Sequence, residues 1–201
     1  MTTISPAPPA WAERLLRAQL APRDRDPVSG DLLEIYRDRV DATGDVLRAD
    51  VWYVLEVLRI AWIEFGPWIV LFALVTLART GFDWLHPTTD FAVRSTWTTV
   101  ASASVMFVAG FASTWRLRSV SSAIVAGLVT SLGGGAIHAI GVLALLAARH
   151  DPATLAAIGG SGGLAEDFTL PLTIALPAAF IAALGGTLAW LTHGATYELE
   201  D

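Results

Sequence analysis

Four long apolar stretches dominate the chain after about residue 60. Three of them, Ser95–Trp115, Ser119–Ala148 and Phe168–Thr192, contain no Asp, Glu, Lys or Arg. The fourth, Phe65–Ala78, is shorter and has apolar residues before it back to Ile60. A helix needs about 20 mostly apolar residues to cross the hydrocarbon core of a bilayer. The sequence therefore predicts an all-α, polytopic membrane protein.

Charged side chains are concentrated near the N-terminus. Residues 1–59 hold eight of the thirteen arginines and ten of the nineteen acidic residues, so this part is slightly acidic. Nucleic-acid arms and polybasic lipid-binding segments both need clustered positive charge. We therefore expect a small helical head at residues 1–60 that takes no nucleic-acid partner.

Two residue types are missing, and their absence excludes several kinds of chemistry. The chain has no cysteine, which rules out disulfides, iron–sulfur clusters, thiolate zinc sites and cysteine nucleophiles. Every positive side chain is arginine, so Schiff-base chemistry and the lysine of a phosphate-binding P-loop are also excluded.

Three short amphipathic helices are predicted in the head. The first has an apolar face around Trp11, Leu15 and Leu16 that Gln19 interrupts, and it should turn Glu13, Arg14 and Arg17 toward solvent before Pro22 ends it. The second should begin with Asp26 as its cap and Pro27 in its first position, and the third should begin after Thr43 as a cap.

The third head helix leads directly into the first of four predicted spans. The spans are expected at about 61–79, 97–115, 121–148 and 169–191, within a bundle at 61–193 that precedes an acidic tail at 194–201. Gly66-Pro67 allows two arrangements of the first span. Either one helix kinks there, or an interfacial helix ends and a shorter spanning helix begins with Pro67 in its first turn.

The arginine distribution predicts the orientation. With the N-terminus inside, the cytoplasmic side receives the head arginines together with Arg116 and Arg118, while the outside receives Arg79, Arg94 and Arg149. Cytoplasmic loops carry the excess of arginine and lysine. We therefore expect a multi-pass protein of the bacterial inner membrane with both termini in the cytoplasm.

Part of the head resembles a known module. Gly30-Asp31-Leu32 and Glu34-x-Tyr36 match a run in the N-terminal permease prefix domain of FtsX-like, macrolide-exporter-type ABC permeases. The resemblance covers roughly residues 6–60. It implies a cytoplasmic helical module attached to export-type machinery, and it brings no catalytic residues. The large extracytoplasmic domain of those permeases has no counterpart here, because four compact spans follow the head.

His138 lies near the middle of the third predicted span, next to the glycine run Gly133–Gly135. An ionisable residue in hydrocarbon is costly and is a functional hypothesis by default. Three interpretations compete: a neutral imidazole hydrogen-bonded across helices, a proton or substrate path, or ligation of a haem or chlorophyll. For the last, Gly134, four positions earlier, would leave room for a macrocycle.

Small residues recur at a spacing of four residues in the third span. Such spacing lets helix backbones approach closely, so we predict a packing seam formed by Gly127, Ser131, Gly135 and Ala139. Gly185 and Gly186 in the fourth span suggest a complementary seam. Glu64, about one turn inside the first span, is expected to reach the inner interface beside Arg59 or Arg118.

No converging catalytic set is visible in the predicted spans, which lack Asp, a His-Glu-x-x-His motif and a Gly-x-Ser-x-Gly motif. We therefore expect a non-enzymatic accessory or regulatory membrane protein without cofactor or metal. Its partners would be the lipid bilayer, other membrane subunits, or a cytoplasmic protein bound through residues 1–60. The alternatives are a small oligomeric transporter or channel that uses His138 and Gly133–Gly135, and a pigment- or haem-binding subunit.

Overall fold

The structure, a computed structural model, describes residues 6–85, 91–148, 152 and 163–197. Some features of the sequence fall wholly or partly outside these residues. They are Asp83, His86 and Asp90 between the first two predicted spans, the glycine-rich run Gly159–Gly163 between the last two, and the predicted acidic tail at 194–201.

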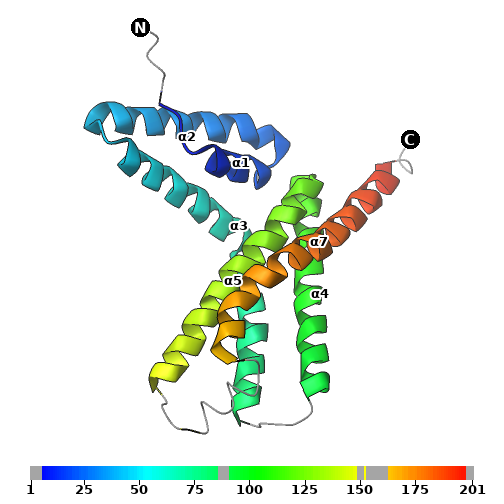
Figure 1. Ribbon diagram of the computed structural model, residues 1–201. Coiled ribbons are helices and arrows are strands. Elements are labelled where there is room, and N and C mark those ends of the chain that lie inside the picture. The colour runs from blue at the N-terminus through cyan, green and yellow to red at the C-terminus, as the bar shows by residue number, and fades with distance from the viewer. Residues whose placement is uncertain (1–5, 86–90, 149–151, 153–162, 198–201) are drawn as a thin grey trace.

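The described residues are almost entirely helical, which confirms the all-α prediction. The six helices, in chain order, are α1 (Ala10–Ala18), α2 (Pro22–Thr43), α3 (Val46–Leu85), α4 (Phe91–Leu117), α5 (Val120–Ala148) and α7 (Gly163–Tyr197). Figure 1 shows α1, α2 and the first part of α3 as a head above a bundle that contains the rest of α3 with α4, α5 and α7.

Four of these helices are long and apolar enough to cross a membrane, so the protein has the fold of a multi-pass membrane protein. Their apolar segments are Val46–Phe82, Ser95–Leu117, Val120–Ala148 and Pro171–Thr192. Three of the predicted spans match these segments closely. The first extends much further toward the N-terminus than predicted, because α3 serves both the head and the bundle.

Two helix starts in the head differ from the predicted ones. Helix α2 begins at Pro22, with Ala21 as its N-cap, so Asp26 is not a cap and Pro27 lies inside the helix. Proline suits the first position of a helix because its missing N–H would have no intrahelical partner there. Pro22, which was predicted only to end the first helix, takes that position in α2. Asp45, rather than Thr43, caps α3 by accepting a hydrogen bond from the Arg48 N–H at 3.0 Å.

Helix α3 is continuous through Gly66-Pro67, which decides between the two arrangements of the first span. Pro67 lies inside the 40-residue helix, and its ring removes one N–H from the helical hydrogen-bond ladder. Figure 1 shows that the head part of α3 runs obliquely while its lower part runs along the bundle. At about 1.5 Å per residue the helix is about 60 Å long, twice the hydrocarbon thickness of a bilayer.

Head and bundle each have a hydrophobic core. The head core consists of six buried side chains from its three helices: Ala12, Leu16, Tyr36, Ala49, Tyr53 and Val57. In the bundle, Phe65 and Ile69 of α3 pack with Ala126 of α5. Phe72 packs in a second cluster that includes Met106 of α4 and Ala178 of α7.

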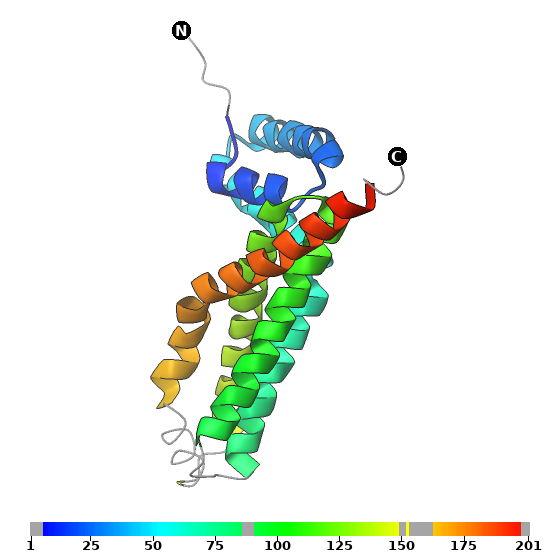
Figure 2. The ribbon, with the colours of Figure 1, turned by 90° about the vertical axis from the view of Figure 1, so that its right-hand side faces the viewer.

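Helix α7 crosses the bundle in contact with both α4 and α5. It contains Pro171 and Pro177, and Figure 2 shows that it bends between its lower and upper parts. A proline in a helix interior is a common cause of such a bend. The upper part of α7 ends on the same side of the molecule as the head.

Candidate functional site at the junction of head and bundle

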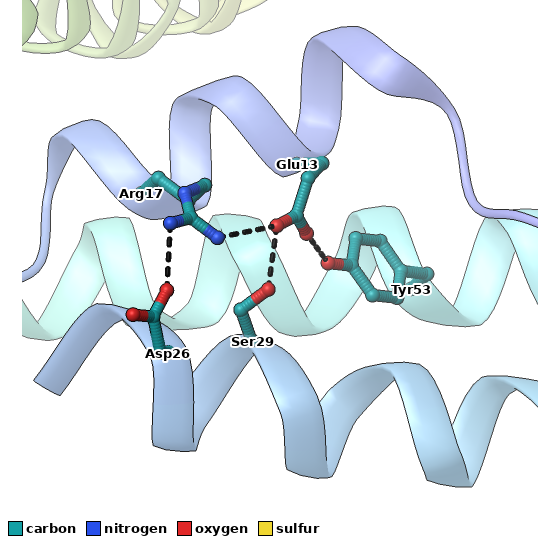
Figure 3. A network of polar contacts seen from close by, with 5 residues as sticks. All are labelled: Glu13, Arg17, Asp26, Ser29 and Tyr53. Carbon is teal, nitrogen blue, oxygen red and sulfur yellow. Dashed lines mark hydrogen bonds and ion pairs between the residues drawn. The ribbon is translucent and has the colours of Figure 1, made fainter.

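The head is held together by a polar network centred on Glu13. Its carboxylate accepts hydrogen bonds from Ser29 Oγ on α2 at 2.5 Å and from the Tyr53 hydroxyl on α3. Arg17, one turn later on α1, lies 3.7 Å from the same carboxylate and 2.7 Å from Asp26 Oδ1 of α2. Figure 3 shows these five side chains converging between the helices. Glu13 is therefore turned toward the other helices and not toward solvent as predicted, whereas Arg17 remains exposed while it bonds to Asp26.

Gln19 is also integrated into the head. It is 2% exposed, and its Nε2 donates a hydrogen bond to the Val57 carbonyl oxygen of α3 at 3.1 Å. Buried polar groups are costly unless they are hydrogen-bonded. The polar residue that interrupts the apolar face of α1 therefore fixes α1 against the part of α3 that enters the bundle.

Tyr36 joins α2 to α3 on the other side of the head core. Its hydroxyl donates to Asp50 Oδ1 at 2.8 Å and lies 3.2 Å from the Ala7 carbonyl oxygen. Burial, followed by the hydrogen bond to Asp50 and the charge of that carboxylate, raises the pKa of Tyr36 to about 12. Tyr36 and Asp50 thus tie the N-terminal segment, α2 and α3 together.

Arg25 connects the head to the turn between α4 and α5. Its Nε donates to the Leu20 carbonyl oxygen at 3.2 Å, and its Nη2 lies 3.4 Å from Ser119 Oγ. The pair is separated by 94 positions in the sequence, so it marks a tertiary contact between the head and the bundle.

The turn that receives Arg25 has a defined shape. Arg118 adopts a positive φ of 51°, which is uncommon for a residue other than glycine. The carbonyl oxygen of Ser119 accepts hydrogen bonds from Thr114 Oγ1 at 3.2 Å and from Ser122 Oγ at 2.6 Å. Both ends of the connection are therefore fixed, and the Ser119 hydroxyl is presented to the head.

An ion pair lies where α3 enters the bundle. Glu64 forms an ion pair with Arg116 at the end of α4, rather than with either arginine that the sequence suggested. Arg59 instead pairs with Glu56 on its own helix at 3.6 Å. The Glu64 side chain is 16% exposed and that of Arg116 is 57% exposed, so the pair lies at the edge of the bundle.

These contacts define a junction in which Arg25 holds the head on Ser119 of the α4–α5 turn, while Glu64 and Arg116 join α3 to α4 at the adjoining edge of the bundle. The Arg25–Ser119 contact and the continuous helix α3 both cross from head to bundle. Among the described residues, no group of three or more histidine and acidic side chains could hold a metal ion.

His138 is buried inside the bundle, at 4% exposure. It lies on the same face of α5 as Gly134 and Gly141, which adjoin α3. A Cβ on Gly134 would lie 2.6 Å from the Phe72 ring, and one on Gly141 would lie 2.6 Å from Leu77. The space beside Gly134 is therefore filled by α3, which leaves no room there for a macrocycle.

The glycine run beside His138 belongs to a continuous helix. Gly133 faces Ile69, whose side-chain atoms would be 3.2 Å from an added Cβ, while Gly135 faces Pro171 of α7. Helix α5 extends without interruption from Val120 to Ala148. The glycine run thus allows α3 and α7 to pack closely against α5.

The predicted seam residues lie as follows. A Cβ on Gly127 would be 2.6 Å from the Ala178 carbonyl oxygen of α7. Ser131 is fully buried and donates to the Leu128 carbonyl oxygen of its own helix at 3.0 Å, and Ala139 is half-buried. Gly127 and Gly135 thus both lie against α7.

The two glycines of the fourth span lie mainly against α4. Gly185 adjoins the Phe107 carbonyl, and a Cβ on Gly186 would lie 2.6 Å from Thr114 Oγ1 and 2.5 Å from Ala123 of α5. On α4, Gly110 adjoins the Ala182 carbonyl in return. Gly110 was not predicted from the sequence, because it does not belong to a repeat of small residues like the one that contains Gly127 and Gly135.

Comparison with known proteins adds no family assignment: the chain matches no protein-family model, and no significant match was found among curated proteins or solved structures.

Proposed function

We propose that this chain is a non-enzymatic accessory or regulatory subunit of a membrane assembly, whose head binds a partner and transmits that binding to the bundle. The observation that carries this proposal is the continuity of α3. Its residues Ala49, Tyr53 and Val57 belong to the head core, while Phe65 and Ile69 of the same helix belong to the bundle core. A displacement of the head therefore acts directly on the bundle.

The junction supports the same proposal. Arg25 contacts Ser119 at the α4–α5 turn, and Glu64 pairs with Arg116. The head is thus attached to the α4–α5 turn in addition to α3, and the Glu64–Arg116 pair joins α3 to α4, so a partner that moved the head would act on three of the four long helices. We further propose that the head is related to the permease prefix module, which makes an export-type permease the first partner to seek.

The same observations support a location in the bacterial inner membrane with the head in the cytoplasm. Arg116 and Arg118 lie at the end of the bundle that carries the head, as the contact between Arg25 and Ser119 requires. The head itself carries eight of the thirteen arginines. An excess of arginine on one side favours the cytoplasm for that side.

The test is purification of the full chain in mild detergent, followed by mass spectrometry of the proteins that travel with it. Trp11 on α1 is 56% exposed, and exposed tryptophans are common anchors of protein interfaces. We expect a membrane or cytoplasmic protein to accompany the wild-type chain and the Arg14→Ala control, and to be depleted several-fold by Trp11→Ala. If the accompanying proteins were the same for all three chains, binding through this face of the head would be refuted.

The second candidate function is a small transporter or channel, which the burial of His138 favours. The filled space at Gly133–Gly135 makes it the weaker candidate, because Ile69, Phe72 and Pro171 occupy the sides of that segment. Flux in proteoliposomes that disappears in His138→Ala would favour transport over the accessory role. The accessory role predicts that His138→Ala keeps the co-purifying partner.

A further inference from the structure

The head part of α3 carries an apolar stripe on the side that α1 and α2 do not cover. Its members recur every three or four residues, so they lie on one face of the helix. Leu47 is 74% exposed and Leu55 is 59% exposed. The stripe consists of Leu47, Val51, Leu55, Leu58 and Trp62.

The opposite side of the same segment packs against the rest of the head. Ala49, Tyr53 and Val57 are buried against α1 and α2. Figure 1 shows those two helices on one side of the oblique part of α3, and no described helix covers the other side. Large apolar surfaces that remain exposed in this way mark interaction sites.

We propose that this stripe, Leu47–Trp62, lies in the surface of the membrane that the bundle spans, as an interfacial amphipathic segment. The first argument is continuity. The helix that carries the stripe enters the bundle directly after Trp62, where Phe65 is already packed against α5. One end of the stripe is therefore fixed at the level where the membrane begins, whatever else the head binds.

The second argument is the chemistry along the edge of the stripe. Arg48 and Arg59 follow Leu47 and Leu58 by one residue, and both side chains are exposed. Of the nearby acids, Asp50 bonds to Tyr36 in the head, whereas Glu56 lies 3.6 Å from Arg59 and partly neutralises it, so Arg48 carries most of the positive charge along this edge. Arginines beside an apolar face can bury their stems and place their charge among lipid phosphates.

The third argument is Trp62 itself, which is half-exposed at the lower end of the stripe. Tryptophan is enriched at the membrane–water interface because its ring is apolar while its N–H needs a polar partner. The stripe thus has the features of an interfacial segment: leucine and valine on one face, arginines at the border and tryptophan at the depth of the headgroups.

The competing occupant is a second copy of this chain. Val51, Leu55, Leu58 and Trp62 have the four-three-four spacing of a coiled-coil seam. That pattern normally has to persist over about three heptads to specify a coiled coil. Here it continues into Phe65 and Ile69, which are already buried within the bundle, so a paired coil would be too short.

The test uses the absence of cysteine from the chain. Leu55→Cys on the stripe and Asp38→Cys on the exposed surface of α2 would each be labelled with a fluorophore in the full chain. The labelled chains would be reconstituted into lipid nanodiscs, with or without lipids that carry a nitroxide quencher in the headgroup region. We expect quenching of the Leu55 label to exceed that of the Asp38 label several-fold.

The aqueous quencher iodide should give the reverse order, with the Leu55 label protected. Equal exposure of both labels to iodide would overturn the proposal. So would efficient disulfide cross-linking between two Leu55→Cys chains, because that result would place a second copy on the stripe. In an Arg48→Gln, Arg59→Gln chain we expect lipid quenching at Leu55 to fall, and no change would contradict the role of the border arginines. The measurement needs no partner protein, so it is independent of the proposed accessory role.

Discussion

The carboxylate of Glu13 receives hydrogen bonds from two other helices of the head, through Ser29 and Tyr53. It is also within ion-pair distance of Arg17, which in turn reaches Asp26. Hydrogen bonds to charged groups are stronger than those between neutral groups. A head this small buries little apolar surface, so these polar contacts are a substantial part of what orders α1.

Replacing Glu13 by glutamine tests this. The amide keeps the shape of the side chain but removes its charge, so Arg17 loses its partner on α1 and the Tyr53 hydroxyl loses a charged acceptor. We expect the head to be destabilised by about 1–3 kcal/mol. Hydrogen exchange of the full chain in nanodiscs should show faster exchange in α1 and α2, with the lower bundle unchanged. The exposed Arg14→Gln should leave the exchange of α1 as it is, and equal rates in Glu13→Gln and wild type would contradict the prediction.

Tyr36 makes the stability of the head depend on pH in the alkaline range. Its pKa is raised to about 12, above the ordinary value of 10.0. In the unfolded chain the hydroxyl loses its proton near pH 10, whereas in the folded head it keeps it. The stability that the protonated Tyr36 hydroxyl contributes to the folded head is therefore fully present below pH 10 and is lost as the pH rises toward 12. Urea unfolding of the head, measured at steps from pH 9 to 11, should show this loss, and Tyr36→Phe should show a smaller one. Parallel declines for the two chains would refute the assignment.

At the scale of helices, the bundle depends on positions where a side chain would meet another backbone. Gly185 adjoins the Phe107 carbonyl, and Gly110 adjoins the Ala182 carbonyl. In a membrane, helices associate through close packing because lipid tails are as apolar as leucine side chains. The approach of α4 and α7 at these glycines is therefore the physical basis of the bundle.

Gly185→Ala should accordingly weaken the bundle, although alanine is the better helix former. Overpacking a tight contact costs about 1–3 kcal/mol, and the backbone of α4 has to move to admit the methyl group. Denaturation of the purified chain in mixed detergent, followed by its helical circular dichroism, should give a lower midpoint. Gly81→Ala is the matched control, because nothing lies within 4 Å of a Cβ at that position. An unchanged midpoint for Gly185→Ala would refute the close contact.

The spans could be predicted from the sequence because their signal is local: each one contains a long apolar run without charge. The contacts of the head could not, because they depend on which distant segments meet. Glu13 lies at the edge of the apolar face of α1, and nothing near it in the sequence indicates that Ser29 and Tyr53 will face it. The same holds for Glu64, whose partner Arg116 is determined by the packing of α3 against α4. The start of α2 was misplaced because Pro22 and Pro27 both suit the first position of a helix, and the prediction used Pro22 only as the end of α1.

On the scale of the whole molecule, α3 joins head and bundle without a break. It supplies three side chains to the head core and continues through the bundle to Leu85. Arg25 adds a lateral attachment of the head to the α4–α5 turn, and Glu64 ties α3 to α4. A partner bound to the head would therefore act on the packing of the long helices, and this coupling is what an accessory or regulatory role needs.

A cytoplasmic partner requires the head to lie in the cytoplasm, and the orientation can be measured directly. The predicted topology assigns the eight arginines of the head, with Arg116 and Arg118, to one side of the membrane and three arginines to the other. Because the chain has no cysteine, single cysteines report the two sides. Asp41→Cys lies on the exposed surface of α2, and Leu85→Cys is 75% exposed at the far end of α3.

A membrane-impermeant maleimide applied to intact spheroplasts should label Leu85→Cys at once and Asp41→Cys only after the membrane is permeabilised. The arginine distribution gives the reason, since transfer of a head with this many charged side chains across the membrane is disfavoured. Labelling of Asp41→Cys in intact spheroplasts would place the head outside. A cytoplasmic partner of the head would then be excluded, and a partner that acts on the bundle through α3 would have to lie on the outer side of the membrane.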